Sequence, residues 1–130
     1  MRVYNKCIFA LLLLCINSLT AKNLEANFQY FNFQNNLGIN YIETYLSFLS
    51  TELTYKQINS EEFQGSILIN MVIKQNDTIK HIDKYLFNTP ILKDTLKRQY
   101  FIDKQIIALN NGSYELSLEL KDTNSNKSSI

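Results

Sequence analysis

Strict alternation of apolar and polar residues is the feature that most constrains this chain. From residue 114 to residue 121 it continues without interruption: tyrosine and leucine occupy one parity, while glutamate, serine and lysine occupy the other. A strand buried on one face produces this period of two, whereas an amphipathic helix repeats about every 3.6 residues. The segment therefore predicts a β-strand whose apolar side faces a core.

Other segments carry the same signal of extended structure. They span residues 27–33, 40–49, 66–74, 79–87 and 100–109. In the 40–49 segment we expect the even-numbered side chains to face the core, and these are Ile42, Thr44, Leu46 and Phe48. The 66–74 run is apolar on both parities, which favours a central strand.

Turn residues predict how these strands connect. Asn76 and Asp77 have turn chemistry and predict a hairpin between the runs on either side of them. Pro90 lacks an N–H and argues against a central strand, so residues 91–98 form either one helical turn or a crossover between sheets. Residues 123–130 predict a polar tail outside the domain, which leaves the preceding strand with an open edge.

These patterns predict an all-β fold, an immunoglobulin- or fibronectin-like antiparallel β-sandwich of six to seven strands over residues 22–122. Such sandwiches often contain a tyrosine whose hydroxyl bonds back to the preceding chain and fixes the corner between the sheets. Leu109, Gly112 and Tyr114 have this arrangement, with a glycine free to adopt positive φ. The alternative is a plain hairpin at Asn111 and Gly112 with a core tyrosine.

The first residues predict export from the cytoplasm. Arg2 and Lys6 precede a nine-residue apolar run at 8–16, and a polar stretch then leads to Ala21. This order is typical of a signal peptide, residues 1–21, cleaved after Ala21. The run is far shorter than the roughly 20 residues of a membrane-spanning helix, so we expect no transmembrane span in the mature chain.

Both cysteines lie within this predicted signal peptide. Cys15 leaves open a lipid anchor, because exported lipoproteins carry a cysteine after the apolar run, but Leu14 replaces the small residue expected before it. Cleavage after Ala21 removes Cys7 as well as Cys15. The mature chain then has no disulfide, no thiol nucleophile and no cysteine metal site.

Charge and motif content exclude several function classes. Without Arg2 and Lys6, eleven of the thirteen basic residues remain against twelve acidic ones, so the net charge is about −1 and nucleic acid is not an expected partner. The single histidine, His81, has Asp83 two residues on but no nucleophile motif nearby. We therefore expect no catalytic residue, no metal site and no cofactor.

Aromatic residues are the remaining candidates for recognition. Tyr41 and Tyr45 lie on the predicted outer face of the 40–49 strand, where they could contact a protein partner or stack on sugar rings. The alternative is cross-strand pairing for these tyrosines, with core packing for the phenylalanines of the 27–33 strand.

Four stretches carry a resemblance to a known family. They are YIETYLSF at 41–48, SILINMVIK at 66–74, DKYLFNTP at 83–90 and IALNNGSYELSLELKD at 107–122. Together with the signal peptide, this pattern resembles the N-terminal β-rich region of exported Bacteroidetes proteins of the GWxTD-domain family. The GWxTD motif itself is absent from this sequence. The resemblance implies an extracytoplasmic accessory module and carries over no catalytic residue.

We expect a non-catalytic β-sandwich module for protein–protein interaction or scaffolding in the bacterial envelope, periplasmic or extracellular. Its partner is another envelope protein or a downstream domain that pairs with the open strand edge. Two alternatives remain: a glycan-binding domain that uses Tyr41 and Tyr45, and a truncated accessory domain of a larger exported protein.

Overall fold

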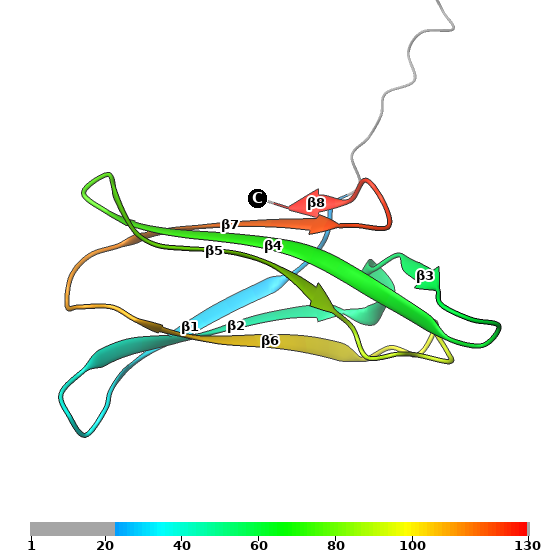
Figure 1. The fold of residues 1–130 in the computed structure, drawn as a ribbon, viewed down its shortest axis with the longest axis horizontal. Helices are drawn as coiled ribbons and strands as arrows, with labels where there is room; N and C mark the ends of the chain where they lie inside the picture. The colour runs from blue at the N-terminus through cyan, green and yellow to red at the C-terminus, as the bar shows by residue number, and fades with distance from the viewer. Residues whose placement is uncertain (1–22, 130) are drawn as a thin grey trace, which may run out of the picture.

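Two antiparallel β-sheets face each other in the computed structural model, which describes residues 23–129 (Figure 1). The three-stranded sheet has the order β1-β2-β6, with β1 at Asn27–Gln34, β2 at Asn40–Leu49 and β6 at Tyr100–Ala108. The predicted signal peptide lies outside the described residues.

The second sheet is built around β4, which pairs with β5 along one edge and with β3 and β7 along the other. Its strands are β3 (Tyr55–Gln57), β4 (Phe63–Gln75), β5 (Thr78–Asn88), β7 (Glu115–Asp122) and β8 (Ser128–Ser129). A short 3-10 helix, η2 (Ser50–Glu52), links β2 to β3. The chain is thus an all-β sandwich, and its six long strands match the predicted number.

The core follows directly from the alternation in β2 and β4. The even residues of β2 point inward, as predicted, and Phe48 packs its ring at 5.1 Å from Phe87 and 6.0 Å from Phe101. The odd residues of β4 are almost fully buried, and these are Ile67, Ile69, Met71 and Ile73. Because both sheets contribute these side chains, the core holds the two layers together.

The predicted connections are also present. Asn76 and Asp77 adopt φ values of 49° and 60°, as a tight turn between the paired strands β4 and β5 requires. Residues 91–98 form no helix and carry the chain from β5 to β6, which lies in the other sheet. On the way, the backbone N–H groups of Leu92 and Phe63 donate to each other's carbonyls.

The predicted polar tail instead packs on the sheet, which corrects the expected domain end. The carboxylate of Asp122 is fully buried and accepts hydrogen bonds from the Thr54 N–H, the Asn124 N–H and the Ser125 hydroxyl. These bonds reverse the chain so that β8 pairs with Leu120 and Lys121. Local side-chain acceptors can replace apolar burial in fixing a turn, so polar composition alone was misleading here.

Candidate interaction site

Four aromatic rings gather on the outward face of the three-stranded sheet, which we call the outer aromatic face: Phe31, Phe33, Tyr41 and Tyr45. Phe33 lies opposite Tyr41 in the register, and their rings stack at 5.4 Å with an angle of 22°. Phe31 meets Tyr45 edge to face at 5.9 Å. The predicted tyrosine pair is therefore on the outer face, and both tyrosines pair across strands with phenylalanines.

This arrangement corrects the expectation that all the phenylalanines of β1 pack in the core. Phe31 is 52% exposed and Phe33 is 43% exposed, whereas Phe28 packs against the core from the other face of the strand. The strand carries aromatic residues on both parities, because Tyr30 shares the inward side with Phe28. Sequence alternation alone therefore could not assign its faces.

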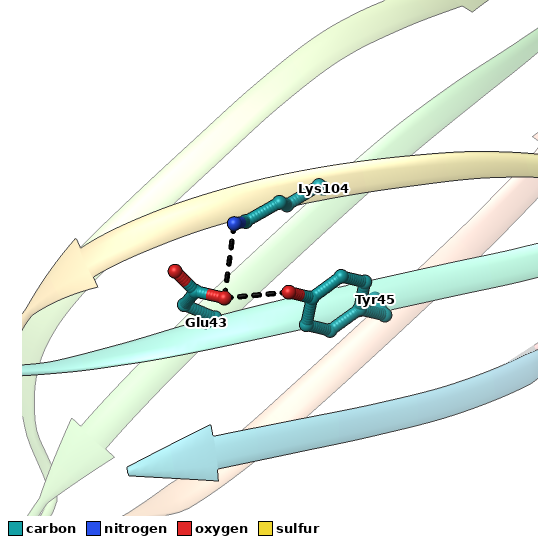
Figure 2. Close-up of polar contacts among 3 residues, drawn as sticks. All are labelled: Glu43, Tyr45 and Lys104. Carbon is teal, nitrogen blue, oxygen red and sulfur yellow. Dashed lines mark hydrogen bonds and ion pairs between the residues drawn. The ribbon is translucent and has the colours of Figure 1, made fainter. Parts of the chain in front are cut away.

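A polar group lies beside these rings (Figure 2). The Tyr45 hydroxyl donates to Glu43 Oε2 at 2.5 Å, and Lys104 Nζ on β6 lies 2.9 Å from the same oxygen. The hydrogen bond from Tyr45, followed by the one from Lys104, holds the pKa of Glu43 below its ordinary value. The bond to Glu43 likewise raises the pKa of Lys104. Both groups stay charged at neutral pH, so the trio orders the middle of this face.

The predicted tyrosine corner is formed. The Tyr114 hydroxyl donates to the Asn110 carbonyl at 2.8 Å, while the Leu109 N–H bonds the Asn40 carbonyl and closes β6 on its own sheet. Since β6 and β7 belong to different sheets, this connection is a corner and not a hairpin.

Gly112 differs from its predicted role in this corner. The described glycine with positive φ is Gly38, so Gly112 does not supply a left-handed turn. A Cβ at Gly112 would instead meet the side-chain amide of Gln75. The residue therefore allows close approach of the corner to the end of β4.

The long side of the sandwich bounded by β1 and β7, here the β1/β7 side, is open between the sheets. A cavity of about 330 Å³ lies there. Its lining consists of Phe28, Tyr30, Asn32, Ile42, Ile73, Leu109, Gly112, Tyr114 and Leu116. The inward-pointing residues of these two edge strands are mainly apolar or aromatic: Phe28 and Tyr30 on β1, Leu116 and Leu118 on β7.

Within residues 23–129, the Glu115–Glu119 part of β7 has no strand partner on this side. β8 covers only Leu120 and Lys121, as Figure 1 shows by its short arrow at the end of β7. The Asp122 N–H donates toward β8, to Lys127, whereas the Thr123 N–H donates toward β4, to Ser66. Amides alternate along a strand, and the register with β4 is regular, so the N–H groups of Leu116 and Leu118 point to the open edge.

The opposite long side, the β5/β6 side, presents polar groups inward. His81 and Asp83 share the inward parity of β5, and Asp103 and Gln105 share that of β6. The Tyr85 hydroxyl of β5 donates to Asp103, and the Gln105 amide donates to the same carboxylate at 3.2 Å. Burial, followed by the bond to Asp103, raises the pKa of Tyr85.

Within residues 23–129 no hydrogen bond joins His81 to Asp83, although the two share a strand face as predicted. The same residues contain no group of three metal-ligating side chains. None of the helices found in that part of the chain has the length and apolarity to cross a membrane.

Searches of family models, curated proteins and solved structures return no match for this chain.

Proposed function

We propose that this chain is a non-catalytic β-sandwich module that acts outside the cytoplasm of a bacterial cell and binds another protein by strand pairing. The observation that carries the proposal is the Glu115–Glu119 part of β7, which has no outer strand partner within residues 23–129 and lies beside an opening between the sheets that is lined mainly by apolar and aromatic side chains. An exposed edge offers backbone donors and acceptors in a fixed spacing, and an extended segment of a partner can add to it without special side chains. The export part of the proposal comes from residues 1–21.

Three features favour the β7 edge over the edges on the β5/β6 side. Its inward side chains at Leu116 and Leu118 are apolar, so a strand added there buries apolar surface. On the β5/β6 side an added strand would bury Asp83 and Asp103, and inward charges are a known device against edge pairing. In addition, β5 is irregular, since its register with β4 shifts between Ile73 and Lys74.

Capture from a bacterial envelope extract tests this function when two matched variants are compared. Leu116→Lys places a charge inward at the β7 edge, and Ile106→Lys places the same charge on the exposed face of β6. We expect the first variant to lose the captured partner and the second to keep it, with circular dichroism verifying that both fold. Equal capture by Leu116→Lys and the unmodified chain would contradict strand pairing at β7.

Glycan binding is a second candidate, favoured by the exposure of Phe31 and Phe33 beside Tyr41 and Tyr45. Aromatic platforms with a nearby carboxylate, here Glu43, suit sugar rings because they combine stacking with hydrogen bonding. A glycan array on the folded chain tests this candidate. A blank array would remove it, whereas binding lost in Tyr41→Ala but kept in Tyr114→Phe would support it.

A further inference from the structure

We infer that the space between the sheets at the tyrosine corner binds a small uncharged amphiphile. The molecule that fits has an apolar tail and a head that carries hydroxyl or amide groups. This inference goes beyond strand pairing and does not depend on it. It follows from two adjoining hollows with different walls, one apolar and one rich in carboxamide groups.

The two hollows form one continuous space. The inner hollow is the 330 Å³ cavity on the β1/β7 side, and an outer hollow of about 400 Å³ adjoins it. Binding sites for small molecules commonly have volumes of roughly 300–1,000 Å³. The residues that line both hollows are Asn32, Ile42, Leu109, Gly112 and Tyr114.

The wall of the inner hollow is mainly apolar and aromatic. Phe28 and Tyr30 line it from β1, and Ile73 and Leu116 line it from the five-stranded sheet. Tyr30 points inward but is 59% exposed, while Phe28 and Leu116 are only partly buried. An apolar tail in this hollow would remove that surface from water, which favours binding.

The wall of the outer hollow is rich in carboxamide side chains. Asn32, Asn110 and Asn111 are exposed, and within residues 23–129 their side chains form no hydrogen bond. Gln34 and Asn40 also line this hollow and bond to each other at 3.1 Å. Because a carboxamide both donates and accepts hydrogen bonds, this group of side chains suits a head with hydroxyl or amide groups.

The charge of the walls restricts the ligand further. Among the described residues, no aspartate, glutamate, lysine, arginine or histidine lines either hollow. A charged head would therefore lose water without gaining an ion pair, which is costly. Lys80 lines a neighbouring hollow together with Asn40 and Asn110, so an anionic head is the alternative that the experiment must separate.

The tyrosine corner fixes the wall of this space. The Tyr114 hydroxyl donates to the Asn110 carbonyl at 2.8 Å, and the Leu109 N–H donates to the Asn40 carbonyl at 3.2 Å. The short strand β8 pairs at the opposite end of β7 (Figure 1). The residues that form the site thus lie away from β8, and their own hydrogen bonds hold them in place before a ligand enters.

A set of three probes tests the inference on the full chain. The first probe is n-octyl β-glucoside below its micelle concentration, with an uncharged sugar head and an apolar tail. Glucose supplies the head without the tail, and sodium octyl sulfate supplies the same tail with an anionic head. Binding is followed through backbone amide shifts in NMR spectra, which give both the affinity and the residues affected.

Two matched variants locate the site. Asn32→Trp places an indole where the two hollows meet, whereas Gln29→Trp places the same ring on the opposite face of β1. Both positions are exposed, so we expect both variants to fold, and circular dichroism verifies this.

We expect the octyl glucoside to shift the amides of Ile73, Asn111 and Leu116, and to bind more tightly than either glucose or octyl sulfate. Asn32→Trp should weaken this binding by about tenfold or more, while Gln29→Trp should leave it within about twofold. Absent binding, equal binding of glucose or octyl sulfate, or unchanged affinity in Asn32→Trp would each overturn the inference. Shifts confined to Phe31, Tyr45 and their neighbours would also overturn it, and would place the ligand on the outer aromatic face instead.

Discussion

Both long sides of this sandwich are bounded by edge strands, but the side chains that these strands point inward differ in polarity. On the β5/β6 side, the edge strands point His81, Asp83 and Asp103 inward, and Tyr85 bonds across the gap to Asp103. On the β1/β7 side, the inward residues Leu116 and Leu118 are apolar. An added strand would bury charges on the first side and apolar surface on the second. Under the proposed function, we therefore expect the inward side chains of an edge strand, more than its free backbone, to decide whether that edge accepts a partner.

Truncation of two phenylalanines, one in the core and one beside the opening on the β1/β7 side, should give the largest difference in unfolding free energy. Phe48 is 1% exposed and contacts Phe87 and Phe101, whereas Phe28 is only partly buried and lines the opening on the β1/β7 side. We expect Phe48→Ala to lower the free energy of unfolding by about 3–5 kcal/mol and Phe28→Ala by about half as much. Urea denaturation measures both. Equal losses would mean that the β1/β7 side is as tightly packed as the core.

Removal of the Asp122 carboxylate should have the next largest effect and should widen the open edge. Asp122→Ala leaves the N–H groups of Thr54 and Asn124 and the Ser125 hydroxyl without their acceptor. We expect a loss of about 2–3 kcal/mol, measured by thermal and urea unfolding. The amide protection of residues at β8 should fall with it. If β8 stays protected in this variant, another contact fixes the end of the chain.

The tyrosine corner should contribute less, because its hydrogen bond is exposed. Tyr114→Phe removes only the bond to the Asn110 carbonyl, so we expect about 1 kcal/mol of destabilisation. Gly112→Ala is a matched test of the same corner and should cost little, because the atom too close to its Cβ is the flexible end of Gln75, while the Tyr114 ring lies at an ordinary contact distance. A large loss in Gly112→Ala with none in Tyr114→Phe would reverse the roles assigned to the two residues.

A rise to alkaline pH should have the smallest effect, and it should act on the β5/β6 side, where Tyr85 is only partly buried. Its pKa is raised in the folded state, so its contribution is fully present below the ordinary tyrosine pKa of about 10 and is lost as the pH rises above it. Unfolding free energies between pH 8 and 11 should therefore fall more steeply for the unmodified chain than for Tyr85→Phe. Identical slopes would show that this hydroxyl is not held protonated by folding.

Sequence reasoning succeeded wherever one parity was apolar and the other polar. β2 and β7 fall in this class, while β4 was predicted as a central strand because it is apolar on both parities. The turn residues Asn76 and Asp77 and the corner residue Tyr114 carried local chemistry that the sequence could reveal. It failed for β1, where Tyr30 and Phe31 are adjacent and the parity of the aromatic residues changes.

The remaining failures have a common physical cause. β3 and β8 are strands of three and two residues that pair with nearby segments, and the Asp122 carboxylate is held by hydrogen bonds, one of them from the Thr54 N–H, 68 residues away. Neither leaves a periodic apolar signal in the sequence. The interaction site was predicted in part, because the sequence placed an open edge on the strand that ends at Lys121 but did not reveal that β8 pairs with Leu120 and Lys121.

Amide hydrogen exchange along β7, followed by NMR, tests the central claim most directly. In the free protein the Leu116 and Leu118 amides should exchange quickly because they point to an open edge, while the Ser117 amide, which points toward β4, should be protected. Slow exchange of Leu116 and Leu118 in the free protein would contradict the claim, because the edge would already be paired.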